Sequence, residues 1–338
     1  PGTYYGQSGA PEGVRIKKDG IRLIGNCNSG KGGKVILVPG AGNKDGILAE
    51  PDDGAPDIQG FYIQGFTVQG FPNNGIKLER VNGFTILRNE SIDNLENGIQ
   101  PELSANGLVK RNVSYGSNDS ALWVEGGVNV RVIGNVTHSS VTGLEVTISK
   151  DLVIKNNESY NNTVGMGLYH PSAASEPALP VMENWQVEQN YIHDNNKPNT
   201  APLGSLAATI PPGGGILLMG VSKNVIERNR VENNDFFGLS IIDFCLASLG
   251  DYDLPGPPWC STNWSGADPV PRDNVIERNT FVNNGTSPPV HPLAPLAAED
   301  TGLRAALAPR SIAVIGASDN PHKIGGRPIA YLARFGYR

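Results

Sequence analysis

Three glutamates recur at equal spacing in the first half of this 338-residue chain. Glu79, Glu102 and Glu125 are separated by 23 residues each. If the backbone stacks these positions, neighbouring carboxylates lie about 5–6 Å apart and repel by roughly 1–3 kcal/mol. Lys77 or Arg111 could screen that repulsion, one acid could stay protonated, or a Ca²⁺ ion could bridge the oxygens. The spacing therefore predicts either a calcium site formed by the three glutamates or a solvated acidic stripe.

Other side chains with useful chemistry fall at the same phase of the spacing. Exposed aromatic rings on a flat sheet can stack on sugar rings, and paired carboxyls can act as acid and base. The candidate catalytic residues are Glu102, Glu125, Tyr169 and His170. The candidate substrate-binding residues are Lys77, Gln100, Trp123 and Glu145. The alternative is that Trp123 and Tyr169 only cover the sheet or pack under a loop.

A recurring asparagine indicates what would hold these residues in line. It ends a series of short apolar runs, and a small residue then opens an alternating strand in each unit. The asparagines are Asn89, Asn112, Asn135, Asn157, Asn190, Asn229 and Asn279, and the small residues are Gly75, Gly98, Ala121, Gly143, Gly165, Gly215 and Gly238. Units of about 22–23 residues with three short strands predict the coils of a single-stranded parallel β-helix, an all-β fold. Asparagine suits its corners, because it tolerates the left-handed conformation and can hydrogen-bond along the axis.

Three units are too long, and the excess indicates insertions. The extra residues fall at 171–183, 196–212 and 244–272, which are rich in Pro, Gly, Ser and Ala. Such stretches are loops, and long loops on a regular scaffold often carry function. We expect those at 171–183 and 244–272 to wall a groove over the third strand of each unit.

Composition excludes several classes of protein. The 42 glycines and 26 prolines disfavour helices, and no run of 18 apolar residues could span a bilayer. A net charge of −6 without a basic block argues against a nucleic-acid partner. Three cysteines are too few for a disulfide scaffold. Cys245 and Cys260 bracket one loop, and either a disulfide or two free thiols fits them.

Residues 1–287 resemble the secreted bacterial right-handed parallel β-helix repeat proteins, which include pectate lyase-like and NosD-like chains. The opening residues 1–4 with 20–25 carry this resemblance, and 196–216 resemble a subfamily of exported chains without an assigned reaction. Mannuronan epimerase-like helices carry Asp-Pro-His-Asp where this chain has Gln100-Pro101-Glu102-Leu103. Only the proline matches, so the epimerase reaction is not expected.

The end of the chain resembles a different family. Residues 309–318 and 323–328 are similar to the start of the CoA-binding domain of nucleoside-diphosphate-forming acyl-CoA synthetases. They indicate one strand, a glycine turn and a helix, and one such unit cannot form a nucleotide cleft. We therefore interpret 288–308 as a linker and 309–338 as a truncated α/β fragment.

These observations predict a secreted, periplasmic or cell-envelope protein, which we expect to be monomeric. Its leading function is binding of a uronate-containing or neutral polysaccharide, with cleavage by β-elimination as the reaction. A non-catalytic binding or cell-envelope module is the alternative, and a fragment of an acyl-CoA synthetase-like fusion is the third.

Overall fold

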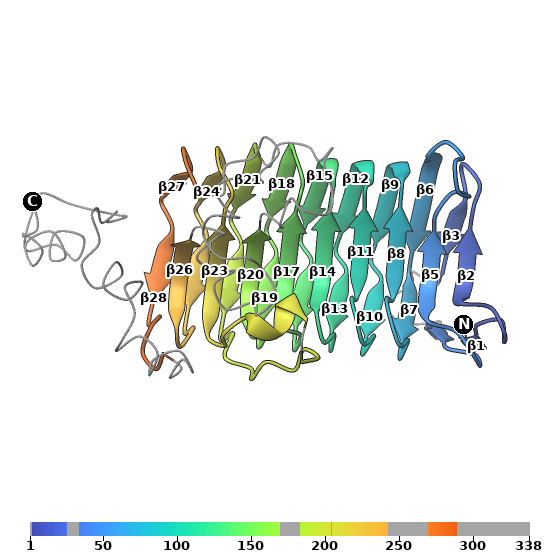
Figure 1. Cartoon of the computed structure of the whole chain (residues 1–338), viewed down its shortest axis with the longest axis horizontal. Helices are drawn as coiled ribbons and strands as arrows, with labels where there is room; N and C mark the ends of the chain where they lie inside the picture. The colour runs from blue at the N-terminus through green and yellow to red at the C-terminus, as the bar shows by residue number, and fades with distance from the viewer. Residues whose placement is uncertain (1, 26–33, 170–182, 204, 243–269, 289–338) are drawn as a thin grey trace, which may run out of the picture. The chain divides into compact units, whose positions relative to one another are not determined.

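The computed structural model describes residues 2–25, 34–169, 183–203, 205–242 and 270–288. Within these residues the strands form three sheets, and all paired strands run parallel (Figure 1). The chain visits sheets A, B and C in that order in every coil, so each strand pairs with the strand three places further along. This is the predicted parallel β-helix.

The strands of each sheet stack along the axis in sequence order. Sheet A contains β1 (Gly2–Tyr5), β4 (Val35–Val38), β7 (Phe66–Gln69), β10 (Glu90–Ile92), β13 (Val113–Tyr115), β16 (Val136–His138), β19 (Glu158–Tyr160), β22 (Tyr191–His193), β25 (Arg230–Glu232) and β28 (Thr280–Val282). Sheet B contains β2 (Glu12–Ile16), β5 (Asp45–Ala49), β8 (Ile76–Glu79), β11 (Ile99–Glu102), β14 (Ser120–Glu125), β17 (Thr142–Thr147), β20 (Val164–Tyr169), β23 (Gly214–Met219) and β26 (Phe237–Ile242). Sheet C contains β3 (Arg22–Ile24), β6 (Ile58–Gln64), β9 (Val81–Leu87), β12 (Ala105–Lys110), β15 (Val128–Ile133), β18 (Leu152–Lys155), β21 (Trp185–Glu188), β24 (Val225–Glu227) and β27 (Val275–Glu277).

The core is one continuous apolar column between the three sheets. Residues predicted to point inward on sheet B are buried, and they pair in register from coil to coil. Ile76, Ile99 and Leu122, for example, are fully buried in successive coils. The alternation along β26 would place Ile241 in the core as well, but Ile241 is 38% exposed. Its strand β26 is the last of sheet B in the described part of the chain, so no described coil covers it.

The predicted asparagine ladder lines the corner between sheets C and A. The Asn112 Oδ1 accepts from the Asn89 backbone N at 2.9 Å, and its Nδ2 donates to Ile86 O and Asn135 Oδ1 at 3.0 Å each. The same pattern continues coil by coil to Asn279. The residue before most of these asparagines has a left-handed φ, for example 55° at Arg111. Each buried amide thus satisfies backbone groups of the corners next to it.

A second ladder, which sequence analysis did not identify, lies at the corner between sheets A and B. The side chains of Asn162, Asn195 and Asn234 are linked at 2.9–3.0 Å. Serines replace asparagine in two earlier coils of this corner, where Ser117 N donates to Ser140 Oγ at 3.0 Å. The mixture of residue types obscured this second period.

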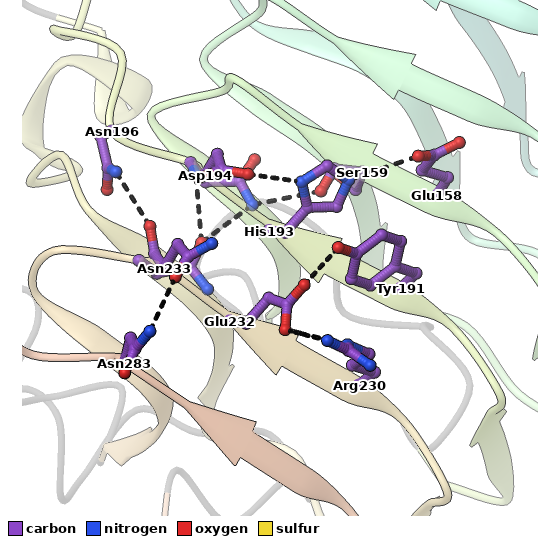
Figure 2. A network of polar contacts seen from close by, with 12 residues as sticks. Glu158, Ser159, Tyr191, His193, Asp194, Asn196, Arg230, Glu232, Asn233 and Asn283 are labelled. Atoms are coloured by element: carbon purple, nitrogen blue, oxygen red, sulfur yellow. Dashed lines mark hydrogen bonds and ion pairs between the residues drawn. The ribbon is translucent and has the colours of Figure 1, made fainter.

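The outer face of sheet A carries stacked aromatic rings that end in a polar network. The rings of Tyr115, His138, Tyr160 and His193 stack with centroids 4.5–5.3 Å apart. At the end of this row the His193 ring lies between Asp194 and Glu158, at 2.7 and 3.3 Å (Figure 2). The four rings are half-buried and stack face to face, which links the coils along this side of the helix.

The chain divides into two compact units, residues 1–289 and 290–338. The second unit, which includes the predicted tail 309–338 and most of the linker, lies outside the described residues, and the domain boundary at 287 stays a prediction. Of the three predicted insertions, 196–212 is described and contains a short 3₁₀ helix, η1 (Leu206–Thr209). Most of the other two, with Cys245 and Cys260, falls outside. In the part that is described, no helix is long and apolar enough to cross a membrane.

Candidate active site

The acidic column predicted from the 23-residue spacing is present on the outer face of sheet B. Glu102 pairs in register with Glu79 on one side and with Glu125 on the other. The Lys77 ammonium lies 2.7 Å from Glu102 and 3.4 Å from Glu79. Burial lowers the pKa of Lys77, but hydrogen bonding to Glu102 and the charges of both glutamates outweigh it and raise the pKa. Lys77 therefore pairs with the first two acids of the column and offsets one of their two negative charges.

Glu125, the third acid, has a neutral partner. Its Oε2 accepts a hydrogen bond from Gln100 Nε2 at 2.9 Å. With Lys77 between Glu79 and Glu102, the column does not fit a calcium ion, because an ammonium already contacts the oxygens that would bind it. No group of three His, Cys, Asp or Glu side chains among the described residues could hold a metal ion. Calcium binding stays a prediction, without support from this geometry.

Glu145, one coil further along the same face, has no such cation. It lies on β17, is 9% exposed, and accepts a hydrogen bond from Ser120 Oγ at 2.5 Å. Burial raises the pKa of Glu145 to about 8, and the charge of Asp119 contributes in the same direction. The side chain is therefore a neutral acid at neutral pH, held by a hydroxyl group.

Asp119 precedes Ser120 and is the second acid of this site. Burial raises the pKa of Asp119 to about 6, with a further contribution from the charge of Glu96. The charge of Asp119 acts on Glu145, and the Asp119 pKa of about 6 lies below the Glu145 pKa of about 8, so Asp119 loses its proton first. Two neighbouring carboxyls with separated pKa values are the arrangement that acid–base catalysis requires.

Tyr169 completes the site from β20. Gly167 pairs in register with Glu145, and a Cβ at Gly167 would lie 2.2 Å from Tyr169 Cζ. The tyrosine ring therefore lies back over Gly167, on the side of Glu145. Among the described residues, neither its hydroxyl nor that of Thr142 has a partner with full hydrogen-bond geometry, although the Thr142 hydroxyl lies close enough to lower the pKa values of Tyr169 and Glu145. Burial, and then the charge of Glu145, raise the pKa of Tyr169, which keeps the phenol protonated.

Trp123 lies between the acidic column and Glu145 on the outer face of sheet B. It is half-buried, and its Nε1 donates to Thr147 Oγ1 at 2.8 Å. The outer face thus changes along the axis, from half-buried Lys77, Glu102 and Trp123 to buried Glu145 and Tyr169.

Several predicted residues meet on this face, but three are less exposed than expected. Gln100 is 4% exposed, Tyr169 5% and Glu145 9%. Contacts between coils bury Gln100 and Glu145, and an apolar cluster with Leu217 and Met219 buries Tyr169. The expectation of an exposed tyrosine ring for sugar stacking is therefore wrong. His170 lies outside the described residues.

Sequence analysis missed Asp119 and Ser120. The signal was available, because Glu96 and Asp119 are also 23 residues apart and the Asp119 N donates to Glu96 O at 3.2 Å. These residues precede the alternating strand, where only small residues and corners were considered. A search for acids spaced by 23 residues would have identified Glu96 and Asp119 as neighbours on successive coils.

Comparison with solved structures supports the fold. The A-module of the mannuronan C-5 epimerase AlgE4 from Azotobacter vinelandii is 16% identical, with a TM-score of 0.55 over 86% of this chain and 89% of that one. The A-module of AlgE6 from the same organism is 13% identical, with a TM-score of 0.46 over 86% and 90%. The DFA-IIIase from Arthrobacter chlorophenolicus A6 in complex with GF2 is 15% identical, with a TM-score of 0.48 over 80% and 70%.

Comparison with protein-family models assigns the chain to a family. No curated protein matches the sequence significantly. No match supports the resemblance of the tail to acyl-CoA synthetases. The profile of the right-handed β-helix region matches residues 45–177 and 178–291, most of the chain. Together with the three parallel sheets, this match shows that the chain belongs to the right-handed β-helix family.

Proposed function

We propose that this protein binds a polysaccharide along the outer face of sheet B and cleaves it by general acid–base catalysis. The observation that carries the proposal is the buried, unpartnered hydroxyl of Tyr169 beside two carboxyls with raised pKa values, Asp119 and Glu145. A buried polar group without a partner is costly, and it persists where a ligand can satisfy it. The fold is shared with an enzyme whose name gives mannuronan, a polysaccharide, as its substrate.

The two carboxyls take opposite roles in this proposal. Glu145 carries a proton at neutral pH and donates it to the oxygen of the leaving sugar as the glycosidic bond breaks. Asp119 is ionised above about pH 6 and accepts a proton, either from an attacking water or from a sugar carbon. The Tyr169 hydroxyl donates a hydrogen bond to a sugar oxygen.

The charge around Glu145 favours hydrolysis of a neutral sugar over β-elimination. Asp119 and Glu125 both raise its pKa, so their negative charges reach this site. β-Elimination acts on a uronate, whose carboxylate these acids would repel unless a cation neutralised it. Lys77, the cation of this face, is engaged by Glu79 and Glu102. Elimination remains the second candidate, with calcium as the cation that it would require.

Substrate contacts extend from this site toward the N-terminal coils. Trp123 can stack on a sugar ring, while Lys77 and Gln100 can bind hydroxyl or carboxyl groups. A non-catalytic binding module would use the same face without turnover. Export to the periplasm, the cell envelope or the medium would bring the protein to such a polymer.

Substitution of Tyr169 by Phe is the sharpest test. Because no described residue makes a well-formed hydrogen bond to this hydroxyl, Tyr169→Phe should leave the thermal unfolding midpoint nearly unchanged or raise it, yet lower turnover. Wild type and variant would be assayed on neutral glycans, pectate and alginate, with and without EDTA. New reducing ends without unsaturated ends support hydrolysis, and unsaturated ends that EDTA abolishes support calcium-dependent elimination. Binding without products on every substrate would contradict catalysis and favour the binding module.

A further inference from the structure

Three successive coils of sheet C carry basic side chains and no acidic ones. Residues 81–88, 104–111 and 127–134 contain no Asp or Glu, although the whole chain has a net charge of −6. They contain four cations, which we call the basic patch: Arg88, Lys110, Arg111 and Arg131. The arginines are exposed and Lys110 is half-buried. Across the described ranges no ion pair or side-chain hydrogen bond engages any of the four.

Cations on the later coils of sheet C are neutralised. Lys155 pairs with Glu188 at 2.9 Å, Arg228 with Glu227 at 3.0 Å, and Arg278 with Glu227 at 2.6 Å. Arg88, Arg111, Arg228 and Arg278 all directly precede a ladder asparagine, with left-handed φ values of 52–56°. The same structural position thus carries a paired arginine in the later coils and an unpaired one in the basic patch.

The strand register places apolar side chains among these cations. Lys110 pairs with Leu87 on one side and Ile133 on the other, and Arg131 pairs with Leu108. These three apolar residues are half-buried. Successive coils are about 4.8 Å apart, close to the length of one sugar residue in an extended chain. The surface therefore repeats a cation and an apolar patch at the spacing of a sugar polymer.

We propose that the basic patch binds a polysaccharide that carries carboxylates. Arginine forks match carboxylate geometry, and a sugar ring offers an apolar face to Leu108 and Ile133. Single-stranded nucleic acid is less suited, because its bases stack on aromatic rings and the one aromatic residue of the three segments, Phe84, is buried. This surface lies on a different sheet from Asp119, Glu145 and Tyr169, and the proposal does not depend on their chemistry.

Affinity electrophoresis in gels that contain pectate or alginate would test the patch. R88Q/R111Q removes two unpaired cations, and R228Q/R278Q removes two paired ones from equivalent positions as a control. We expect R88Q/R111Q to weaken retardation by pectate about tenfold at low salt, which corresponds to about 1.4 kcal/mol of binding free energy. The control should bind as wild type does, and a gel with neutral glucan should retard none of them.

Three results would overturn this proposal. The wild-type protein could migrate without retardation in both the pectate and the alginate gel, or the two double variants could lose retardation equally. The wild-type protein could also be retained more strongly by duplex DNA than by pectate. Unfolding midpoints of both double variants would show that each is folded. Because the assay records binding without turnover, and R88Q/R111Q leaves every residue of the sheet B site in place, its failure is separable from failure of the catalytic proposal.

Discussion

Two carboxyls on sheet B, two coils apart on β11 and β17, both lie on its outer face but are chemically opposite. Glu102 contacts the Lys77 ammonium, whereas Glu145 contacts the Ser120 hydroxyl and feels the negative charge of Asp119. The backbone is nearly identical at both places, because the helix repeats. The comparison teaches that the side chain one coil earlier decides the role of a carboxyl on this scaffold. A cationic neighbour pairs with Glu102, and burial beside acids keeps Glu145 protonated, as its proposed role of proton donor requires.

The largest expected difference between Glu145 and Glu102 is the effect of their substitution on turnover. Glu145→Gln keeps the shape of the side chain but cannot donate its proton, so activity should fall about 10²–10⁴-fold. Glu102→Gln should lower activity several-fold at most, because it loses an ion pair and not a reacting proton. Both variants would be compared by kcat on the best substrate found. An equal, complete loss in Glu102→Gln would return the catalytic role to the acidic column.

The next largest difference between Glu145 and Glu102 should appear in how stability depends on pH. Since Glu145 has a raised pKa in the folded state, the unfolded chain loses this proton first as pH rises. The free energy of unfolding should therefore fall between about pH 4.5 and pH 8, by up to about 1.4 kcal/mol per pH unit. Asp119 adds a slope of the same sign between its ordinary pKa of 3.8 and about 6.

Urea unfolding at a series of pH values would measure this slope. Glu145→Gln should flatten it above pH 6, while Glu102→Gln should leave it intact. A wild-type stability that rises from pH 6 to pH 8 would contradict the buried, protonated Glu145.

The contrast also shows how far the sequence predicts such a site. The repeated asparagines and the alternation after Gly75 and Gly98 are local signals, so strands and register followed from them. The Glu79–Glu102–Glu125 column followed from the same arithmetic. Burial of Glu145 and Tyr169 did not, because it depends on contacts such as that of Tyr169 with Leu217, 48 positions further along the chain. Spacing predicts which residues are neighbours, but not how much water remains between them.

A smaller effect is expected when Lys77, the cation that contacts the acidic column, is replaced. Lys77→Met leaves Glu79 and Glu102 facing each other without their shared partner, and should cost about 1–2 kcal/mol of stability at pH 7. The loss of stability should shrink in a Glu102→Gln background, because only one acid is then left unpaired. Equal costs in both backgrounds would show that Lys77 acts through packing of its alkyl chain alone.

The smallest expected effect comes from Glu125, which connects the acidic column to the site around Glu145. This residue belongs to the acidic column, yet its charge also raises the pKa of Glu145, by less than that of Asp119 does. Glu125→Gln should therefore lower the pKa of Glu145 and move the alkaline limb of the pH–rate profile to lower pH, by less than about one unit. The acid limb, near the Asp119 pKa of about 6, should stay in place because Glu96 is the charge acting there. Glu102→Gln serves as the control, and a shift of the same size in both variants would mean that the column acts on Glu145 as a whole. A shift confined to Glu125→Gln would limit the electrostatic reach of the column to its nearest coil.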